Sequence, residues 1–178
     1  MRKLKLYIAQ SIDGFIATEK GSVEWLNDNE NEEIDENAYG YLDFYSSIDT
    51  TLMGYNTYKE IVNFGIPFPY PDKKNYVFSK NHEKKEDNPV EFIKSNIVEF
   101  VSNLKQLDEK DIWLIGGGEI NKILLNKNLI DEIIITIKSV VLGKGIPLFA
   151  NGTDFKKFKI TKVEKFDDSF AQIIMERK

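Results

Sequence analysis

Three consecutive glycines, Gly116, Gly117 and Gly118, separate an apolar run from a segment with helical spacing in IWLIGGGEINKILL (112–125). Glycine loses more conformational freedom on ordering than any other residue, so three in succession need a reason. A strand that passes directly into a helix leaves free N–H groups at the positive end of the helix dipole, where phosphate binds. The pattern is neither a Rossmann fingerprint nor a P-loop. A tight turn packed against a neighbouring segment is the alternative interpretation.

A second glycine turn occurs in TTLMGYNTYKEI (50–61), where Gly54 follows an apolar run. Asn56 and Thr57 are placed to cap a short helix. Thr57 and Glu60 have the spacing of a capping box, which would occupy the same amides that a phosphate would use.

A third strand end carries Ser79 and Lys80, whose hydroxyl and ammonium groups would suit a further phosphate. A surface lysine after a strand is also common. In a parallel sheet the three strand ends would lie along one carboxyl edge, where nucleotides bind. The three ends together therefore favour a nucleotide site.

Strands that alternate with helices predict an α/β fold with a mixed, mostly parallel sheet and helices on both faces. The last segment, FKITKVEKFDDSFAQIIMERK (158–178), predicts a C-terminal antiparallel hairpin. Strands are predicted at Leu4–Ala9, Thr50–Met53, Tyr76–Ser79, Val90–Ile93, Ile112–Ile115, Glu132–Leu142, Phe158–Glu164 and Phe170–Glu176. Helices are predicted at Ile34–Ser47, Thr57–Val62, Ile97–Leu107 and Glu119–Asn126.

Length and charge limit the class of protein. The 178 residues suit one domain, 1–178. The net charge of −5, from 24 basic and 29 acidic side chains, argues against a nucleic-acid partner. The chain has no cysteine and one histidine, so no metal site is expected. It has no apolar run of the roughly 20 residues that a membrane span needs, so we expect a cytoplasmic protein with a small-molecule substrate.

The order of motifs resembles the dihydrofolate reductase superfamily, especially the branch of the reductase (RibD C-terminal-like) domain of bacterial riboflavin biosynthesis. The opening SIDGFIA is similar to that branch's first motif, and MGYNTYKEI, VFSK and IGGGEI are similar to later ones. LIDEIIITIKSVVLGKGIPLF (129–149) resembles the family's last long segment. The matches run in order over nearly the whole chain.

The resemblance implies NADPH as cofactor. Ala9 and Ile16 would meet the nicotinamide carboxamide through their backbones. The phosphates would lie against the start of one helix, at Gly54, Tyr55, Asn56 and Thr57. The adenosine 2′-phosphate would lie near Ser79 and Lys80. The pyrophosphate would lie against the second glycine turn, at Gly116, Gly117, Gly118, Glu119 and Ile120. Tyr55 stands where the family often has arginine, which leaves preference for NADPH over NADH open.

The resemblance also implies a substrate site at Ser11, Asp13 and Trp25, to which Thr136 in the long strand is added. For Asp13 a turn-capping role, for Trp25 a core position and for Thr136 an ordinary strand position are the alternatives. The branch usually carries a glutamate where this chain has Gly116. Folate reductases place a carboxylate on the first helix, within reach of the pterin, and the resemblance leaves Glu30 and Asp35 as candidates for that side chain. No catalytic acid is assigned.

The expected function is NADPH-dependent hydride transfer to a small heterocyclic, pyrimidine- or pterin-like substrate, as in 5-amino-6-(5-phosphoribosylamino)uracil reductase. Dihydrofolate reductase is one alternative, and a dinucleotide-binding protein without turnover is another. The long strand Glu132–Leu142 and the apolar stretch 66–68 could serve a homodimer interface.

Overall fold

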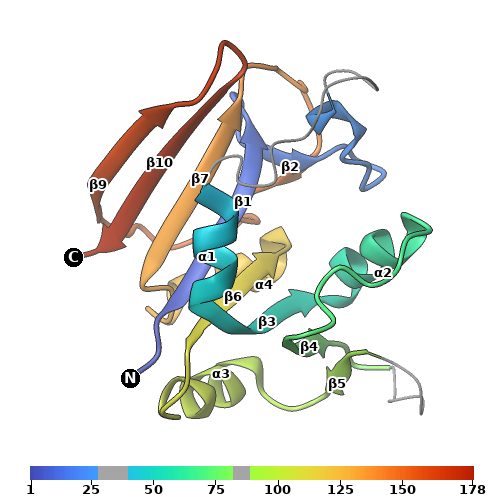
Figure 1. Cartoon of the computed structure of the whole chain (residues 1–178), viewed down its shortest axis with the longest axis vertical. Helices are drawn as coiled ribbons and strands as arrows, with labels where there is room; N and C mark the ends of the chain where they lie inside the picture. Colours follow the sequence, from blue (N-terminus) through green and yellow to red (C-terminus); the bar gives the residue numbers. More distant parts are fainter. Residues whose placement is uncertain (28–39, 82–88) are drawn as a thin grey trace.

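The computed structural model describes residues 1–27, 40–81 and 89–178. Its centre is an eight-stranded sheet in the order β5-β4-β3-β6-β1-β7-β10-β9 (Figure 1). The strands β1, β3, β4, β5, β6 and β7 are parallel, and β10 pairs antiparallel with both β7 and β9. The predicted mixed sheet with a C-terminal antiparallel hairpin is confirmed.

The strands of this sheet coincide with the apolar, β-branched runs of the sequence, as buried strands should. Their bounds are β1 Leu4–Ser11, β3 Ile48–Gly54, β4 Lys74–Phe78, β5 Glu91–Ile93, β6 Asp111–Gly116, β7 Glu132–Lys138, β9 Phe158–Lys165 and β10 Phe170–Arg177.

Helices cover both faces of the sheet, as predicted. The helices are α1 Tyr41–Ser47, α2 Tyr55–Asn63, α3 Ile97–Lys105 and α4 Gly118–Asn126, with a short 3-10 turn η1 at Glu24–Leu26. Apolar residues of α3 and α4 join the core cluster around Leu4, Leu6 and Leu114. On the other face, α1 contributes Phe44 to an aromatic cluster with Tyr7 and Trp113, and Ile61 of α2 packs beside it.

The predicted strand Glu132–Leu142 is too long, because β7 ends at Lys138. The chain then turns over the end of β1, where the amide of Ile12 donates to the carbonyl of Val140 over 2.9 Å. Since β7 lies between β1 and β10, both of its edges are paired, and this strand offers no free edge to a second copy.

A small second sheet was not predicted. It pairs β2 (Phe15–Ala17) with β8 (Ile146–Pro147) in antiparallel fashion. Strands of three and two residues are too short to show a periodic pattern. The first part of the helix predicted at Ile34–Ser47 lies outside the described residues, and its remainder is α1.

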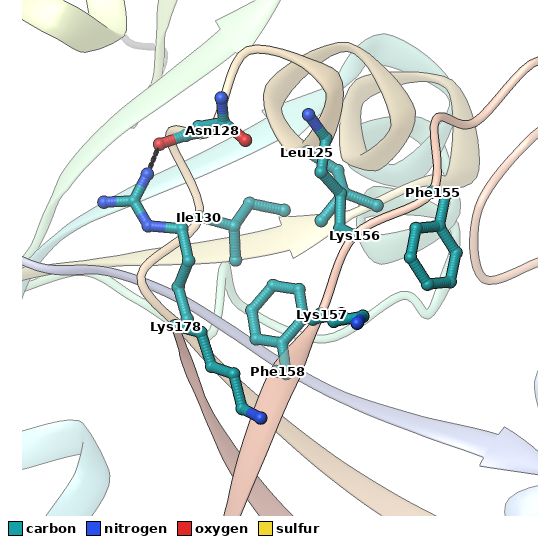
Figure 2. A pocket seen from close by; sticks show the side chains of 9 residues that line it. Leu125, Asn128, Ile130, Phe155, Lys156, Lys157, Phe158 and Lys178 are labelled. Carbon is teal, nitrogen blue, oxygen red and sulfur yellow. Dashed lines mark hydrogen bonds between the residues drawn. The ribbon is translucent and has the colours of Figure 1, made fainter.

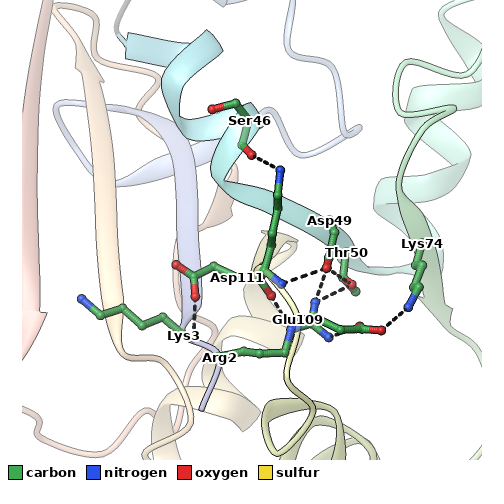
Figure 3. Close-up of polar contacts among 9 residues, drawn as sticks. Arg2, Lys3, Ser46, Asp49, Thr50, Lys74, Glu109 and Asp111 are labelled. Carbon is green, nitrogen blue, oxygen red and sulfur yellow. Dashed lines mark hydrogen bonds and ion pairs between the residues drawn. The ribbon is translucent and has the colours of Figure 1, made fainter.

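At the amino edge of the parallel strands, the guanidinium of Arg2 is buried, with 3% of the residue exposed. It contacts the carboxylates of Asp49 and Glu109, the latter at 2.9 Å, and donates to the Thr50 hydroxyl over 2.7 Å (Figure 3). Glu109 also pairs with Lys74 at 2.6 Å. These contacts join the starts of β1, β3 and β4 at the edge opposite the cleft described below.

Candidate active site

A cleft of about 700 Å³ opens at the carboxyl edge of the sheet. Its walls come from the ends of β1, β3 and β6, from the first turns of α2 and α4, and from β2. Of the residues predicted to contact the cofactor, those that line the cleft are Ala9, Ile16, Gly54, Tyr55, Asn56, Thr57, Gly117, Gly118, Glu119 and Ile120. Two glycine turns 62 residues apart in the sequence therefore meet at one cavity.

The two helix starts lie side by side in the wall of the cleft. A Cβ added to Gly54 would lie 3.2 Å from the Ile120 Cγ1 atom, and one added to Gly117 would lie 3.4 Å from the Thr57 hydroxyl oxygen. Both helices begin directly after their strands, with Gly54 and Gly117 as N-cap residues. Two positive helix ends thus point into the same space.

The predicted capping box at Thr57 is wrong. The helix α2 begins two residues earlier than expected, because Gly54 is the N-cap, so Thr57 lies inside the first turn. Both N-caps are glycines, and among the described residues no side chain caps the start of α2 or of α4. The amides that a capping box would have occupied are left without a side-chain cap.

The three successive glycines have three different surroundings. Gly116 is buried and has φ +124°, a conformation that side chains rarely adopt. A Cβ on Gly118 would lie 2.4 Å from the Pro147 carbonyl oxygen. Gly117 faces Thr57 and Ile16 in the cleft, at φ −89°. The alternative interpretation, a tight turn packed against a neighbouring segment, explains Gly118. Gly117 borders the cleft instead, where a ligand can approach it.

The segment that approaches Gly118 is held by a buried side chain that the sequence did not reveal. Asn121 is fully buried, and its side-chain amide donates to the Leu148 carbonyl over 2.8 Å. The amide of Ala150 donates to the Gly118 carbonyl over 3.1 Å. An asparagine three residues after a helix start has no distinctive pattern, so only the fold shows its role.

The third predicted strand end, Ser79 and Lys80, does not line the cleft. The strand β4 ends at Phe78, which lines the cleft, but Ser79 and the exposed Lys80 do not belong to the lining. The amide of Ser79 donates to the Ile93 carbonyl over 3.2 Å. Their contact with a 2′-phosphate stays a prediction.

Lysines that the sequence analysis did not select do line the cleft. Lys59 lies one turn after Tyr55 on α2, and Lys20 follows β2. The i, i+4 spacing from Tyr55 could have identified Lys59, because such residues share a helix face. The lining also includes Glu19, Glu60 and Glu119, of which Glu119 pairs with Lys122 at 2.6 Å.

Ser11 and Asp13 hold a turn. The buried Ser11 hydroxyl donates to the Asp13 carboxylate over 2.6 Å and accepts from the Phe15 amide over 3.0 Å. The same carboxylate accepts from the amides of Leu142 and Gly143 at 3.1 and 2.7 Å. The Ser11 bond, followed by the amide bonds, keeps the pKa of Asp13 below its usual value. Substrate contact by either residue stays a prediction.

Thr136 takes part in a polar chain across the sheet face that carries α1. Its hydroxyl accepts from the Gln172 side chain over 3.1 Å, and both residues are buried. Tyr7 hydrogen-bonds with both, although burial outweighs these bonds and raises the pKa of its phenol. The three side chains form a neutral row of donors and acceptors.

Trp25 lies in η1 between Val23 and Leu26, which line the cleft. Its indole N–H is buried and has no hydrogen-bond partner among the described residues. Glu30 and Asp35 lie outside the described residues.

Within residues 1–27, 40–81 and 89–178, no group of acidic or histidine side chains could hold a metal ion. In the same ranges, no helix is long and apolar enough to cross a membrane.

Comparisons with known proteins identify the family of this chain. The model of the RibD C-terminal domain family matches residues 71–171. The uncharacterized proteins YwjB and YyaP of Bacillus subtilis (strain 168) are 41% and 33% identical. These alignments cover 93% of this chain and 92% of YwjB, and 97% of this chain and 94% of YyaP.

Solved structures share the fold. A protein assigned to riboflavin biosynthesis in Shewanella sp. PV-4 superposes with a TM-score of 0.86 at 28% identity, over 99% of each chain. A Thermotoga maritima diaminohydroxyphosphoribosylaminopyrimidine deaminase/5-amino-6-(5-phosphoribosylamino)uracil reductase superposes with a TM-score of 0.71 at 20% identity. That match covers 99% of this chain and 57% of the Thermotoga chain. The family match over residues 71–171 and two relatives aligned along nearly the whole chain show that the protein belongs to the RibD C-terminal domain family, with its riboflavin-biosynthesis-type reductase fold.

Proposed function

We propose that this protein is an NADPH-dependent reductase that transfers hydride to a small heterocycle of the pyrimidine or pterin kind. The observation that carries the proposal is the pair of helix starts with glycine N-caps, at α2 and α4, which lie side by side in the wall of one cleft. Two such ends suit the two phosphates of a dinucleotide. The cleft volume of about 700 Å³ lies in the range of small-molecule and cofactor sites.

NADPH supplies the hydride when it is bound, and the chain supplies position. The first turns of α2 and α4 would hold the phosphates, with Gly117 leaving room for close approach. Ala9 and Ile16, which also line the cleft, would present backbone groups to the nicotinamide. Lys59 offers a cation on the same helix face as Tyr55, where the family's arginine is missing.

The substrate would lie beyond Ala9, over the sheet face that carries Tyr7, Thr136 and Gln172. Tyr7, Thr136 and Gln172 bond with one another, so the group left to contact a substrate is the indole N–H of Trp25, which could donate to a carbonyl of a heterocycle. The riboflavin-pathway uracil is such a compound, which supports 5-amino-6-(5-phosphoribosylamino)uracil reductase as the activity.

Steady-state oxidation of NADPH with a substrate panel tests this proposal. We expect turnover with the ribosylaminouracil and none with dihydrofolate. Turnover with dihydrofolate alone would make the protein a dihydrofolate reductase. Saturable NADPH binding without turnover of any heterocycle would contradict the enzymatic part of the proposal and leave a dinucleotide-binding protein.

A further inference from the structure

A second cavity, of about 520 Å³, opens at the other end of α4 (Figure 2). Whereas the candidate active site meets the first turn of α4, this cavity meets its last turn and the loop that leads to β7. Its lining residues are Leu125, Asn128, Ile130, Phe155, Lys156, Lys157, Phe158, Arg177 and Lys178. Helix α4 is nine residues long, about 14 Å, and one cavity lies at each of its ends.

The cavity is strongly cationic. Among the described residues that line it, four are lysine or arginine and none is acidic. The neighbouring carboxylate of Asp131 is shared between Arg177, at 2.9 Å, and Lys105. Asp154 lies 4.0 Å from Lys156. The positive charge thus exceeds the negative charge around the cavity, in a protein whose net charge is −5.

Part of this charge supports the fold. Lys156 donates to the Asn126 carbonyl over 3.3 Å, and Arg177 donates to the Asn128 carbonyl. Both bonds satisfy carbonyls near the end of α4, where cations are favourable. A guanidinium has five N–H donors and an ammonium three, so both retain donors for a ligand. Lys157 and Lys178 form no ion pair with any residue in the described ranges.

The cavity also has an apolar side. Leu125 and Ile130 are 6% and 1% exposed and form part of its inner wall, and Phe158 stands beside them in Figure 2. Phe155 is 84% exposed at the rim, with the Lys157 ammonium 5.8 Å from its ring centroid. An aromatic ring left in water beside a cavity is suited to stack on a flat apolar group.

We propose that this cavity binds a small aromatic anion, in which a carboxylate or phosphate is attached to a flat ring. The anionic group would lie among Lys157, Lys178 and Arg177, and the ring would lie against Phe155 and Phe158. This inference rests on the cavity alone and is independent of the reductase activity proposed above.

Titration of the isotope-labelled full-length chain, followed through its backbone amide NMR signals, tests the site. Phenyl phosphate and benzoate are the probes, and inorganic phosphate and phenol are the matched controls. We expect saturable shifts at Asn128, Phe155 and Phe158, with phenyl phosphate or benzoate binding roughly tenfold more tightly than either control. If phenyl phosphate binds more tightly than benzoate, the anionic group of the ligand is a phosphate dianion. If benzoate binds more tightly, it is a carboxylate.

The variants Lys157→Gln and Phe155→Ser should each weaken the aryl anion by roughly tenfold. Both residues are exposed, so the fold should persist. Lys162→Gln, on the outer strand β9, is the matched control and should bind normally. Equal affinity for phenyl phosphate and inorganic phosphate, shifts confined to the glycine turns, or unchanged binding in Lys157→Gln would each overturn the proposal.

Discussion

Arg2 illustrates how much one residue can contribute to this fold. Its buried guanidinium pairs with two carboxylates and donates a hydrogen bond to a hydroxyl. The two carboxylates are 28% and 30% exposed, and Glu109 also pairs with Lys74, so removing the guanidinium should cost about 2 kcal/mol, less than for a fully buried ion pair. We expect Arg2→Met to lower the melting temperature by about 5 °C in a chain of this size.

The neighbouring Lys3 provides the control for Arg2. Its pair with Glu176, at 3.0 Å, has both side chains nearly half exposed. Such surface pairs contribute about 0–1 kcal/mol, so Lys3→Met should melt close to the parent protein. If the two variants melt alike, Arg2 does not have the structural role assigned to it.

Asp13 gives a pH-dependent prediction. Its pKa is lowered in the folded chain, so its contribution to stability is present above its usual pKa of about 4 and is lost as the pH falls below that value. Asp13→Asn should therefore melt below the parent at neutral pH, and the difference should shrink as the pH falls below about 4. A constant difference between pH 3 and pH 7 would contradict this assignment.

At the scale of elements, close packing against the segment around Pro147 explains why residue 118 is a glycine. Gly117, directly before it, stays accessible to a ligand. Gly118→Ala would place a Cβ 2.4 Å from a carbonyl oxygen. Overpacking of this kind costs about 1–3 kcal/mol or more, against a gain of about 1 kcal/mol in helix propensity. We expect a net loss of about 2 kcal/mol, measured by urea unfolding.

Gly117→Ala is the matched variant. Its Cβ would lie 3.4 Å from the nearest described atom, at an ordinary φ, so stability should change by less than about 0.5 kcal/mol. The prediction is contradicted if Gly117→Ala destabilises the chain as much as Gly118→Ala.

The sequence predicted the elements whose signal is local. The apolar runs located the large strands, and Gly54 and Gly117 marked two turns that meet at the cleft. It missed β2 and β8, because pairing between two short segments 131 residues apart is purely tertiary. It extended β7 beyond Lys138, since the apolar residues Val140 to Leu142 continue the pattern while Asp13 bends the chain there. The place of Asn121 follows only from the fold, whereas the spacing of Lys59 from Tyr55 could have identified it.

At the scale of the whole molecule, the two cavities lie at the two ends of α4 and differ in charge. The candidate active site has acidic and basic side chains in its lining, whereas the charged side chains that the described residues contribute to the second cavity are all basic. Helix α4 presents its positive end to the first cavity, and at the second Lys156 and Arg177 bind carbonyls near its negative end. Ligands of the cleft and of the cationic cavity are therefore expected to differ, with the dinucleotide assigned to the cleft.

The most direct test of this account is the affinity for NADPH and NADH, measured by calorimetry on the parent, Gly117→Val and the control Val62→Ala. Val62 lies on α2 but does not line the cleft. We expect saturable NADPH binding by the parent and by Val62→Ala, and a loss of at least about tenfold in a folded Gly117→Val, because its branched side chain would fill the phosphate position. Unchanged NADPH affinity in Gly117→Val, or no binding of either nucleotide by the parent, would contradict the assignment of the cleft at Gly117 to a dinucleotide.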